Sequence, residues 1–207
     1  MYPTDLDHVI ISIYPEATIL EKVLTDGSHI AHPISPADLA AQLNQIPLST
    51  GLLPPNTLFW RQVGGMECLT IYVPPRRWQP LAYERHYALP MPGMVFMGLG
   101  NQYTVFAVKR KPKSADAILY HLPVPNVNGN GRICRGSVPF PTAGRDTIVA
   151  ALTLFIEGSA FNHDNSQNRC RTFPENTLDL WRQLDGKRKF PNSELVAARL
   201  RLGQLMS

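Results

Sequence analysis

The beginning of the chain alternates short apolar runs with turn residues. Residues 8–14 form a β-branched run, a composition that predicts a buried strand. Residues 16–24 fit either the second strand of a hairpin or a short helix. Asp26 and Gly27 form a turn signal, so residues 28–32 are expected to pair back onto the preceding segment.

A short helix is predicted next, over residues 36–45. Ser35 suits the N-cap position, and Pro36 suits the first helical turn because proline has no N–H to satisfy. The apolar positions expected on its buried side are Leu39, Leu43 and Ile46. The proline-rich residues 47–56 then predict a connecting loop.

The middle of the chain reads as a series of strands joined by short turns, which favours an antiparallel sheet. The predicted strands are residues 58–63, 68–73, 94–99, 103–110 and 118–121. Apolar residues at helical spacing follow, and they predict helices over residues 146–157, 177–184 and 193–205. A mostly antiparallel sheet followed by helices is an α+β fold.

Composition narrows the class of protein. The chain has 207 residues, of which 44% are hydrophobic and 17% charged, as in a globular protein. No apolar run reaches the length of a membrane span, and the first residues lack a secretory signal. The three cysteines have no paired spacing, which favours free thiols in a reducing compartment. We therefore expect a cytoplasmic protein with no membrane partner.

The net charge of +4 comes largely from basic residues late in the chain. They lack the dense stripe with interleaved aromatic residues that is typical of nucleic-acid binding, so no nucleic-acid partner is predicted. A solvated helical face explains them, and a docking surface for an acidic protein is the alternative. Candidate partner contacts are Trp78, Phe140 and the loop of residues 74–77.

One loop carries the candidate chemistry. Residues 123–131 are rich in Pro, Asn and Gly, which fix backbone angles and supply positive φ, so they predict a tightly shaped loop. Three residues further on, this loop presents Cys134. A Gly/Asn-rich turn exposes a side chain more readily than it buries one, which makes the thiol a candidate nucleophile.

The segment from Pro125 to Cys134 resembles the active-site segment of ubiquitin-conjugating (E2) enzymes, which carry His-Pro-Asn, an Asn/Gly turn and Ile-Cys. The resemblance implies that Cys134 accepts a ubiquitin-like C-terminus as a thioester. It also implies that Asn126 orders the loop and helps to stabilise the oxyanion. Val124 stands where the family has its His, and His121 is a candidate substitute. The segment is most similar to the bacterial E2-like branch that includes protein B of PRTRC gene systems.

The same resemblance points to a second segment after the predicted helix of residues 146–157. E2 enzymes often have an acidic residue here that orients or deprotonates the attacking lysine, which makes Asp164 a candidate. The spacing from Ser159 to His163 is similar to that of the bacterial branch, and a histidine is a suitable base near neutral pH. A surface His beside an Asp is the alternative interpretation.

The resemblance implies a UBC (E2)-like fold and a division into three parts. These are an N-terminal hairpin extension with the first helix (1–50), an E2-like core (51–172) and C-terminal helices (173–207). The implied partners are a ubiquitin-like modifier and an E1-like, ThiF-type adenylating enzyme, with a JAB-type metalloprotease encoded nearby. No cofactor is expected.

Three alternatives stay open. The chain could be a non-catalytic E2-variant binding module, which Val124 favours and the retained thiol opposes. It could be a cysteine hydrolase that uses Cys134 and His163, if these lie within hydrogen-bond reach. Zinc binding by Cys134, His163, Cys170 and His121 is the third, although their spacing matches no zinc motif.

Overall fold

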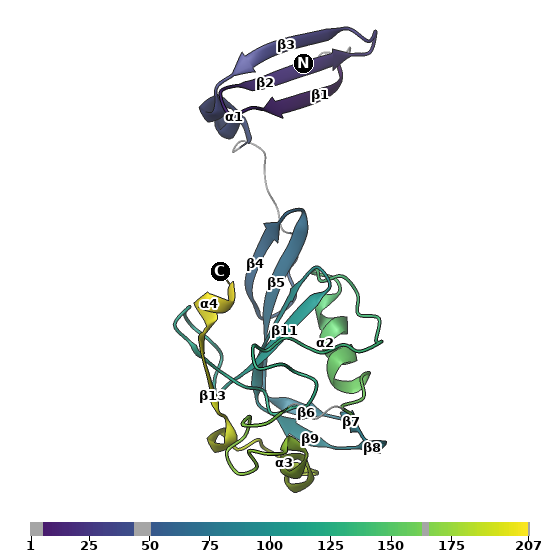
Figure 1. Ribbon diagram of the computed structural model, residues 1–207, viewed down its shortest axis with the longest axis vertical. Helices are drawn as coiled ribbons and strands as arrows, with labels where there is room; N and C mark the ends of the chain where they lie inside the picture. Colours follow the sequence, from purple (N-terminus) through teal and green to yellow (C-terminus); the bar gives the residue numbers. More distant parts are fainter. Residues whose placement is uncertain (1–5, 44–50, 163–165, 207) are drawn as a thin grey trace. The chain divides into compact units, whose positions relative to one another are not determined.

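The computed structural model describes residues 6–43, 51–162 and 166–206. The chain forms two compact units, Met1–Gly51 and Leu52–Ser207. Figure 1 shows the elements of each unit. The larger unit holds the candidate site.

The first unit is a three-stranded antiparallel sheet followed by a helix. Its elements are β1 (Leu6–Ile13), β2 (Thr18–Leu24), β3 (His29–Ile34) and α1 (Pro36–Leu43). Residues 16–24 therefore take the strand alternative, and residues 29–34 pair back as expected. Ser35 caps α1, because its hydroxyl oxygen accepts a hydrogen bond from the Asp38 N–H at 3.0 Å. Of the three positions expected on the buried side of the predicted helix, Leu39 is half-buried. The Leu43 side chain, Ile46 and the predicted helix end at Gln45 lie outside the described part of the chain.

The prediction that residues 8–14 form a buried strand is wrong in one respect. The strand forms, but Val9, Ile10 and Ile11 are 43%, 39% and 42% exposed. A unit this short buries a smaller share of its surface than a larger one, so β-branched residues remain on the surface. Only Thr18 and Val23 are buried among the described side chains of this unit.

The second unit contains a six-stranded antiparallel sheet in the order β13-β12-β11-β10-β5-β4. The strands are β4 (Thr57–Val63), β5 (Met66–Val73), β10 (Gly93–Leu99), β11 (Gln102–Val108), β12 (Ile118–Tyr120) and β13 (Ala197–Arg201). The five strands predicted in this region all form. The mixed and mostly antiparallel architecture agrees with the predicted α+β class.

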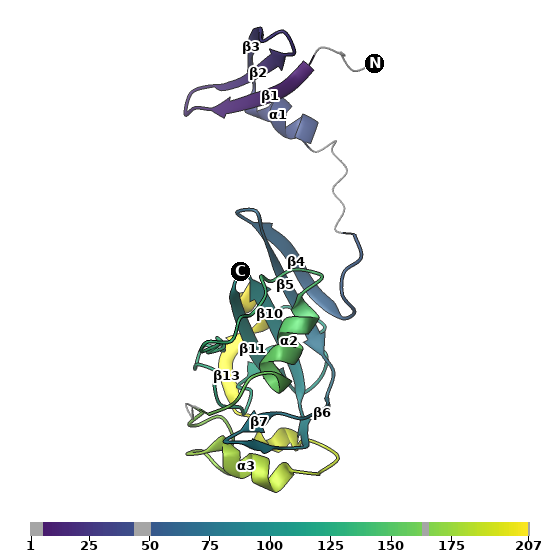
Figure 2. The ribbon, with the colours of Figure 1, turned by 90° about the vertical axis from the view of Figure 1, so that its right-hand side faces the viewer.

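Alternating side chains on the central strands fill two apolar layers. On β10, Met94 and Phe96 join the larger core, and Val95 joins the smaller one on the other face. Figure 2 shows helix α2 (Ile148–Glu157) lying across one face of this sheet, and the buried side chains of the helix belong to the larger core. Its buried residues recur every three or four positions, as in an amphipathic helix: Ile148, Ala151, Leu152, Phe155 and Ile156.

The helix predicted over residues 193–205 is wrong. These residues form a short 3-10 turn (Asn192–Glu194), strand β13 and the short helix α4 (Leu202–Met206). Strand β13 pairs with β12, and the register shifts opposite Leu119 and Tyr120. Arg199 has a φ of 56°, a left-handed conformation that a helix cannot contain. The open edge of β12 therefore overrides the local helix propensity.

Several short elements close one end of this unit. They are β6 (Arg76–Trp78), β7 (Leu81–Ala82), β8 (Arg85–His86), β9 (Leu89–Met91) and α3 (Thr177–Leu184). Helix α3 has the predicted bounds, and Asn176 caps it by accepting from the Leu178 N–H at 2.8 Å. The loop expected at residues 74–77 is partly wrong, because Arg76 and Arg77 belong to β6, which pairs with β9. No helix within the described ranges is long and apolar enough to cross a membrane.

Candidate active site

The three thiols of the chain differ in accessibility. Cys134 is exposed, whereas Cys68 and Cys170 are each 1% exposed. Cys170 donates its S–H to the carbonyl oxygen of Phe173 over 2.9 Å. Cys134 is therefore the one thiol that a large reactant can reach.

Backbone hydrogen bonds fix the segment before Cys134 to the central sheet. The Val105 N–H donates to the Gly131 carbonyl at 2.9 Å, and the Ile133 N–H donates to the Tyr103 carbonyl at 3.0 Å. Ile133 is also 5% exposed, so its side chain anchors the same segment in the core. The thiol thus follows directly after a residue held by strand β11.

The turn before Ile133 is closed by its own backbone. The Asn128 N–H donates to the Arg132 carbonyl at 2.8 Å, and the Gly131 N–H donates to the Asn128 carbonyl at 2.9 Å. Gly131 has a φ of 82°, and a Cβ at this position would lie 2.4 Å from the Phe106 ring. Glycine is therefore required here by both backbone angle and space.

Asn126 connects the cysteine loop to a second loop. It is 7% exposed and has a φ of 58°, a conformation that Asn tolerates better than most residues. Its carbonyl accepts from the Cys134 N–H at 2.7 Å, and its side-chain amide donates to the Ala160 carbonyl at 2.9 Å. Ala160 lies just after α2, so the amide joins the thiol's segment to the loop that leaves this helix.

The second loop is itself attached to the small strands. The Phe161 N–H donates to the Leu81 carbonyl at 2.8 Å, and the Asn162 side chain accepts from the Tyr83 N–H at 2.9 Å. The Phe161 ring is fully buried and meets Trp181 edge-on, with ring centroids 5.3 Å apart. Residues 160–162 are thus positioned by contacts on both sides.

The start of the cysteine loop lies in the core. Val124 is 1% exposed, so the position occupied by His in the E2 pattern is here an apolar core position. The Trp181 indole N–H donates to the Pro123 carbonyl at 2.9 Å. Helix α3 therefore supports the start of the loop through this hydrogen bond. The spacing of residues in the sequence did not predict this contact.

His121 lies at the end of β12, where the loop begins. Its backbone N–H donates to the Val196 carbonyl at 2.9 Å, and its side chain is half-buried. Burial lowers the pKa of His121, and the nearby Arg169 guanidinium lowers that pKa further. The imidazole is therefore neutral at physiological pH.

The other two candidate residues, His163 and Asp164, lie outside the described residues. The described chain carries the second loop as far as Asn162, and the hydrogen bond from Asn126 holds Ala160 beside the cysteine loop. Their proposed roles remain predictions.

Two sequence-based expectations about partner contacts are corrected. Trp78 and Phe140 are 2% and 8% exposed, so neither ring is available to a partner. The neighbouring residues Pro75, Arg76 and Arg77 are exposed. Over the described ranges, no group of three or more His, Cys, Asp or Glu side chains could hold a metal ion.

Comparison with known proteins adds one finding. The family model for prokaryotic E2 family D matches residues 36–198, which include the whole cysteine loop, the loop after α2 and the first two residues of β13. No curated protein and no solved structure matches the chain.

Proposed function

Because the chain belongs to prokaryotic E2 family D, we propose that it is a conjugating enzyme that carries a ubiquitin-like protein as a thioester on Cys134. The observation that carries this proposal is an exposed thiol on a loop hydrogen-bonded to a central strand. Loading a protein onto a thiol needs an accessible nucleophile whose backbone does not move away during attack.

The loading step is an exchange between two thioesters. The Cys134 thiolate attacks the carbonyl carbon of a modifier held on an E1-like, ThiF-type enzyme. A new carbon–sulfur bond forms at Cys134, and the thiolate of the E1-like enzyme leaves. In the second step an amine attacks the same carbon, an amide bond forms, and Cys134 leaves as a thiolate while the amine loses a proton.

Asn126 is assigned a positioning role in this reaction. Its amide donates to the Ala160 carbonyl, and its own carbonyl accepts from the Cys134 N–H. These two bonds support a role in holding the thiol's segment against the neighbouring loop. The family resemblance implies in addition that this amide, which carries two N–H donors, contacts the oxyanion.

His163 and Asp164 are proposed to take the proton from the attacking amine, since they follow the ordered residues 160–162 of the neighbouring loop. His121 is the weaker candidate, because its lowered pKa makes it a poor proton acceptor. We also propose that the strands and helices of the larger unit have a UBC-like arrangement. The modifier is a bacterial ubiquitin-like protein, and a JAB-type metalloprotease would reverse the conjugation.

The test is formation of a covalent adduct. The protein is incubated with an E1-like adenylating enzyme, a ubiquitin-like modifier and ATP, and the products are separated with and without reductant. We expect a reductant-sensitive adduct with the wild type, a reductant-resistant ester with Cys134→Ser, and no adduct with Cys134→Ala. Cys68→Ala is the matched control, because that thiol is buried. An undiminished adduct on Cys134→Ala would overturn the assignment.

A non-catalytic binding module is the second candidate, and one observation favours it. Val124 is buried where the E2 pattern has its His, so that position offers apolar packing in place of a polar group. A module of this kind would bind the modifier or the adenylating enzyme with the same affinity before and after Cys134→Ala. It would form no adduct in the assay above.

A further inference from the structure

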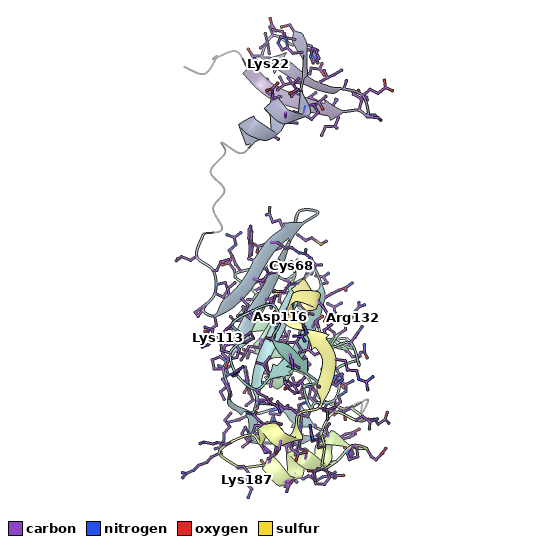
Figure 3. All side chains as sticks on the ribbon, turned by 90° about the vertical axis from the view of Figure 1, so that its left-hand side faces the viewer. Lys22, Cys68, Lys113, Asp116, Arg132 and Lys187 are labelled. Carbon is purple, nitrogen blue, oxygen red and sulfur yellow. The ribbon has the colours of Figure 1, made fainter. Side chains whose placement is uncertain are left out.

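A groove of about 380 Å³ lies between the β6–β9 ribbon and the segment after α3. Its lining residues are Pro75, Arg76, Arg77, Pro90, Met91, Pro92, Arg188, Lys189, Phe190 and Asn192. Figure 3 shows Lys187, the neighbour of Arg188, far from Arg132, which precedes Cys134 by two positions. The groove is therefore separate from the thiol.

The two sides of the groove are joined by a fixed side chain. The Arg77 guanidinium donates to the carbonyl oxygens of Gly186 and Lys187, at 2.9 and 2.8 Å. Arg76 lies over the Trp78 ring, with its guanidinium carbon 3.5 Å from the ring centroid. The cations of β6 are thus held in place before any partner arrives, which lowers the entropy cost of binding.

The groove combines an apolar floor with a cationic rim. Pro90, Met91 and Pro92 are buried beneath it, and Phe190 is half-buried. Arg76, Arg77, Arg188 and Lys189 are exposed around it, and none of the ten lining residues is acidic. This pattern complements a segment that presents carboxylates beside apolar side chains.

We propose that this groove is a docking site for an acidic segment of a partner protein, bound with its carboxylates on the four cations and an apolar side chain on the Pro-Met-Pro floor. Arg76 and Arg77 belong to one wall, and Arg188 and Lys189 to the other, so an extended segment lies between them. This docking site does not depend on the thioester chemistry of Cys134.

A nucleic acid is the less suitable ligand. Binding to single strands uses exposed aromatic faces on which bases stack. In this groove the Trp78 face is covered by Arg76, and Phe190 is half-buried. A peptide needs no such platform, because its carboxylates and apolar side chains match the rim and the floor directly.

The experiment measures binding by fluorescence anisotropy on the full chain. The probe is a short fluorescein-labelled peptide rich in glutamate, with a leucine at every third position. The comparison probes are the same peptide with lysine in place of each glutamate, and single-stranded oligothymidylate. The test variant is Arg188→Glu/Lys189→Glu.

The matched control is Arg110→Glu/Lys113→Glu, which reverses two exposed cations of a different groove. Figure 3 shows Lys113 well apart from Lys187. Circular dichroism on each variant checks that the fold is kept. A second, milder variant, Arg188→Gln/Lys189→Gln, separates loss of charge from any repulsion introduced by the new carboxylates.

We expect the glutamate peptide to bind the wild type and the control alike, and Arg188→Glu/Lys189→Glu to weaken it about tenfold or more. The glutamine variant should give an intermediate loss, and added salt should weaken binding to the wild type. The proposal is overturned by any of three results: no binding to the wild type, equal losses in the test and control variants, or tighter binding of the oligothymidylate. None of these results bears on adduct formation at Cys134, so the docking proposal and the proposed function can fail independently.

Discussion

The side-chain amide of Asn126 donates a hydrogen bond to the carbonyl oxygen of Ala160 over 2.9 Å, although the two residues are 34 positions apart. This contact joins the loop that presents Cys134 to the loop that follows α2. The thiol's segment and residues 160–162, which come directly before the candidate proton acceptors in the sequence, are therefore linked by a hydrogen bond.

Asn126→Asp tests this contact. The substitution keeps the size of the side chain but turns an oxygen toward the Ala160 carbonyl, so the free energy of unfolding should fall by about 1–3 kcal/mol. Adduct formation on Cys134 should slow as well. Urea denaturation measures the first effect and the adduct assay the second.

Asn130→Asp is the matched control. Its side-chain oxygen accepts from the Arg132 N–H at 3.1 Å, and an aspartate oxygen can accept that bond equally. We expect a change in unfolding free energy of no more than about 0.5 kcal/mol. Equal losses in both variants would contradict the role given to Asn126.

Thiol labelling tests the accessibility of Cys134. The native protein should react with one equivalent of a disulfide reagent at pH 8, and Cys134→Ala should remove that reaction. In denaturant all three thiols should react, because Cys68 and Cys170 are buried only in the folded state. Rapid labelling of two thiols in the native wild type would contradict this arrangement.

Gly131→Ala should be strongly destabilising. The new Cβ would meet the Phe106 ring at 2.4 Å, in a backbone with positive φ. Together the two effects should cost about 2–5 kcal/mol of unfolding free energy. Gly129→Ala lies in the same turn, and its Cβ would meet nothing within 4 Å, so it should be close to neutral. Similar melting temperatures for the two variants would refute the geometry.

The lowered pKa of His121 predicts a pH dependence of stability. The folded state binds the proton less tightly than the unfolded state, whose imidazole titrates near pH 6.5. Above that pH both states are neutral and the full stability is present. As the pH falls below about 6.5, the unfolded state gains protons first and stability declines until the folded pKa is passed.

His121→Gln should reduce this dependence of the unfolding free energy on pH. Urea denaturation from pH 7.5 down to about pH 5 measures the unfolding free energies of the wild type and the variant. The difference between them isolates the contribution of this histidine. The other histidines cancel in the difference. A wild-type curve that runs parallel to that of the variant would contradict the pKa direction.

The sequence was sufficient to predict those helices and strands whose local residue pattern agrees with their role in the tertiary structure. Helix α3 has the predicted bounds, because its apolar spacing, its Asn176 cap and its buried face all favour a helix. The central strands alternate between two buried layers, and their β-branched and aromatic residues fit that environment. The shape of the cysteine loop also followed from local residues, since Pro, Asn and Gly act on the backbone directly.

The sequence failed where a distant partner decides the conformation. Residues 197–201 have good helix formers, yet their alternating half-buried positions fit a strand equally well, and the free edge of β12 selects the strand. The links from Pro123 to Trp181 and from Asn126 to Ala160 span 58 and 34 positions, so no local spacing signals them. The burial of strand β1 was misjudged because burial depends on tertiary packing, which a local run of apolar residues does not reveal.

The pairing of β12 with β13 has a consequence for biosynthesis. Strand β12 leads into the cysteine loop, but its outer neighbour β13 is translated only after the loop and α2. Until residues 197–201 emerge, the nascent chain exposes the unpaired edge of β12 next to the loop that carries Cys134. Completion of the sheet that holds the cysteine loop is therefore delayed until residues 197–201 have been synthesised.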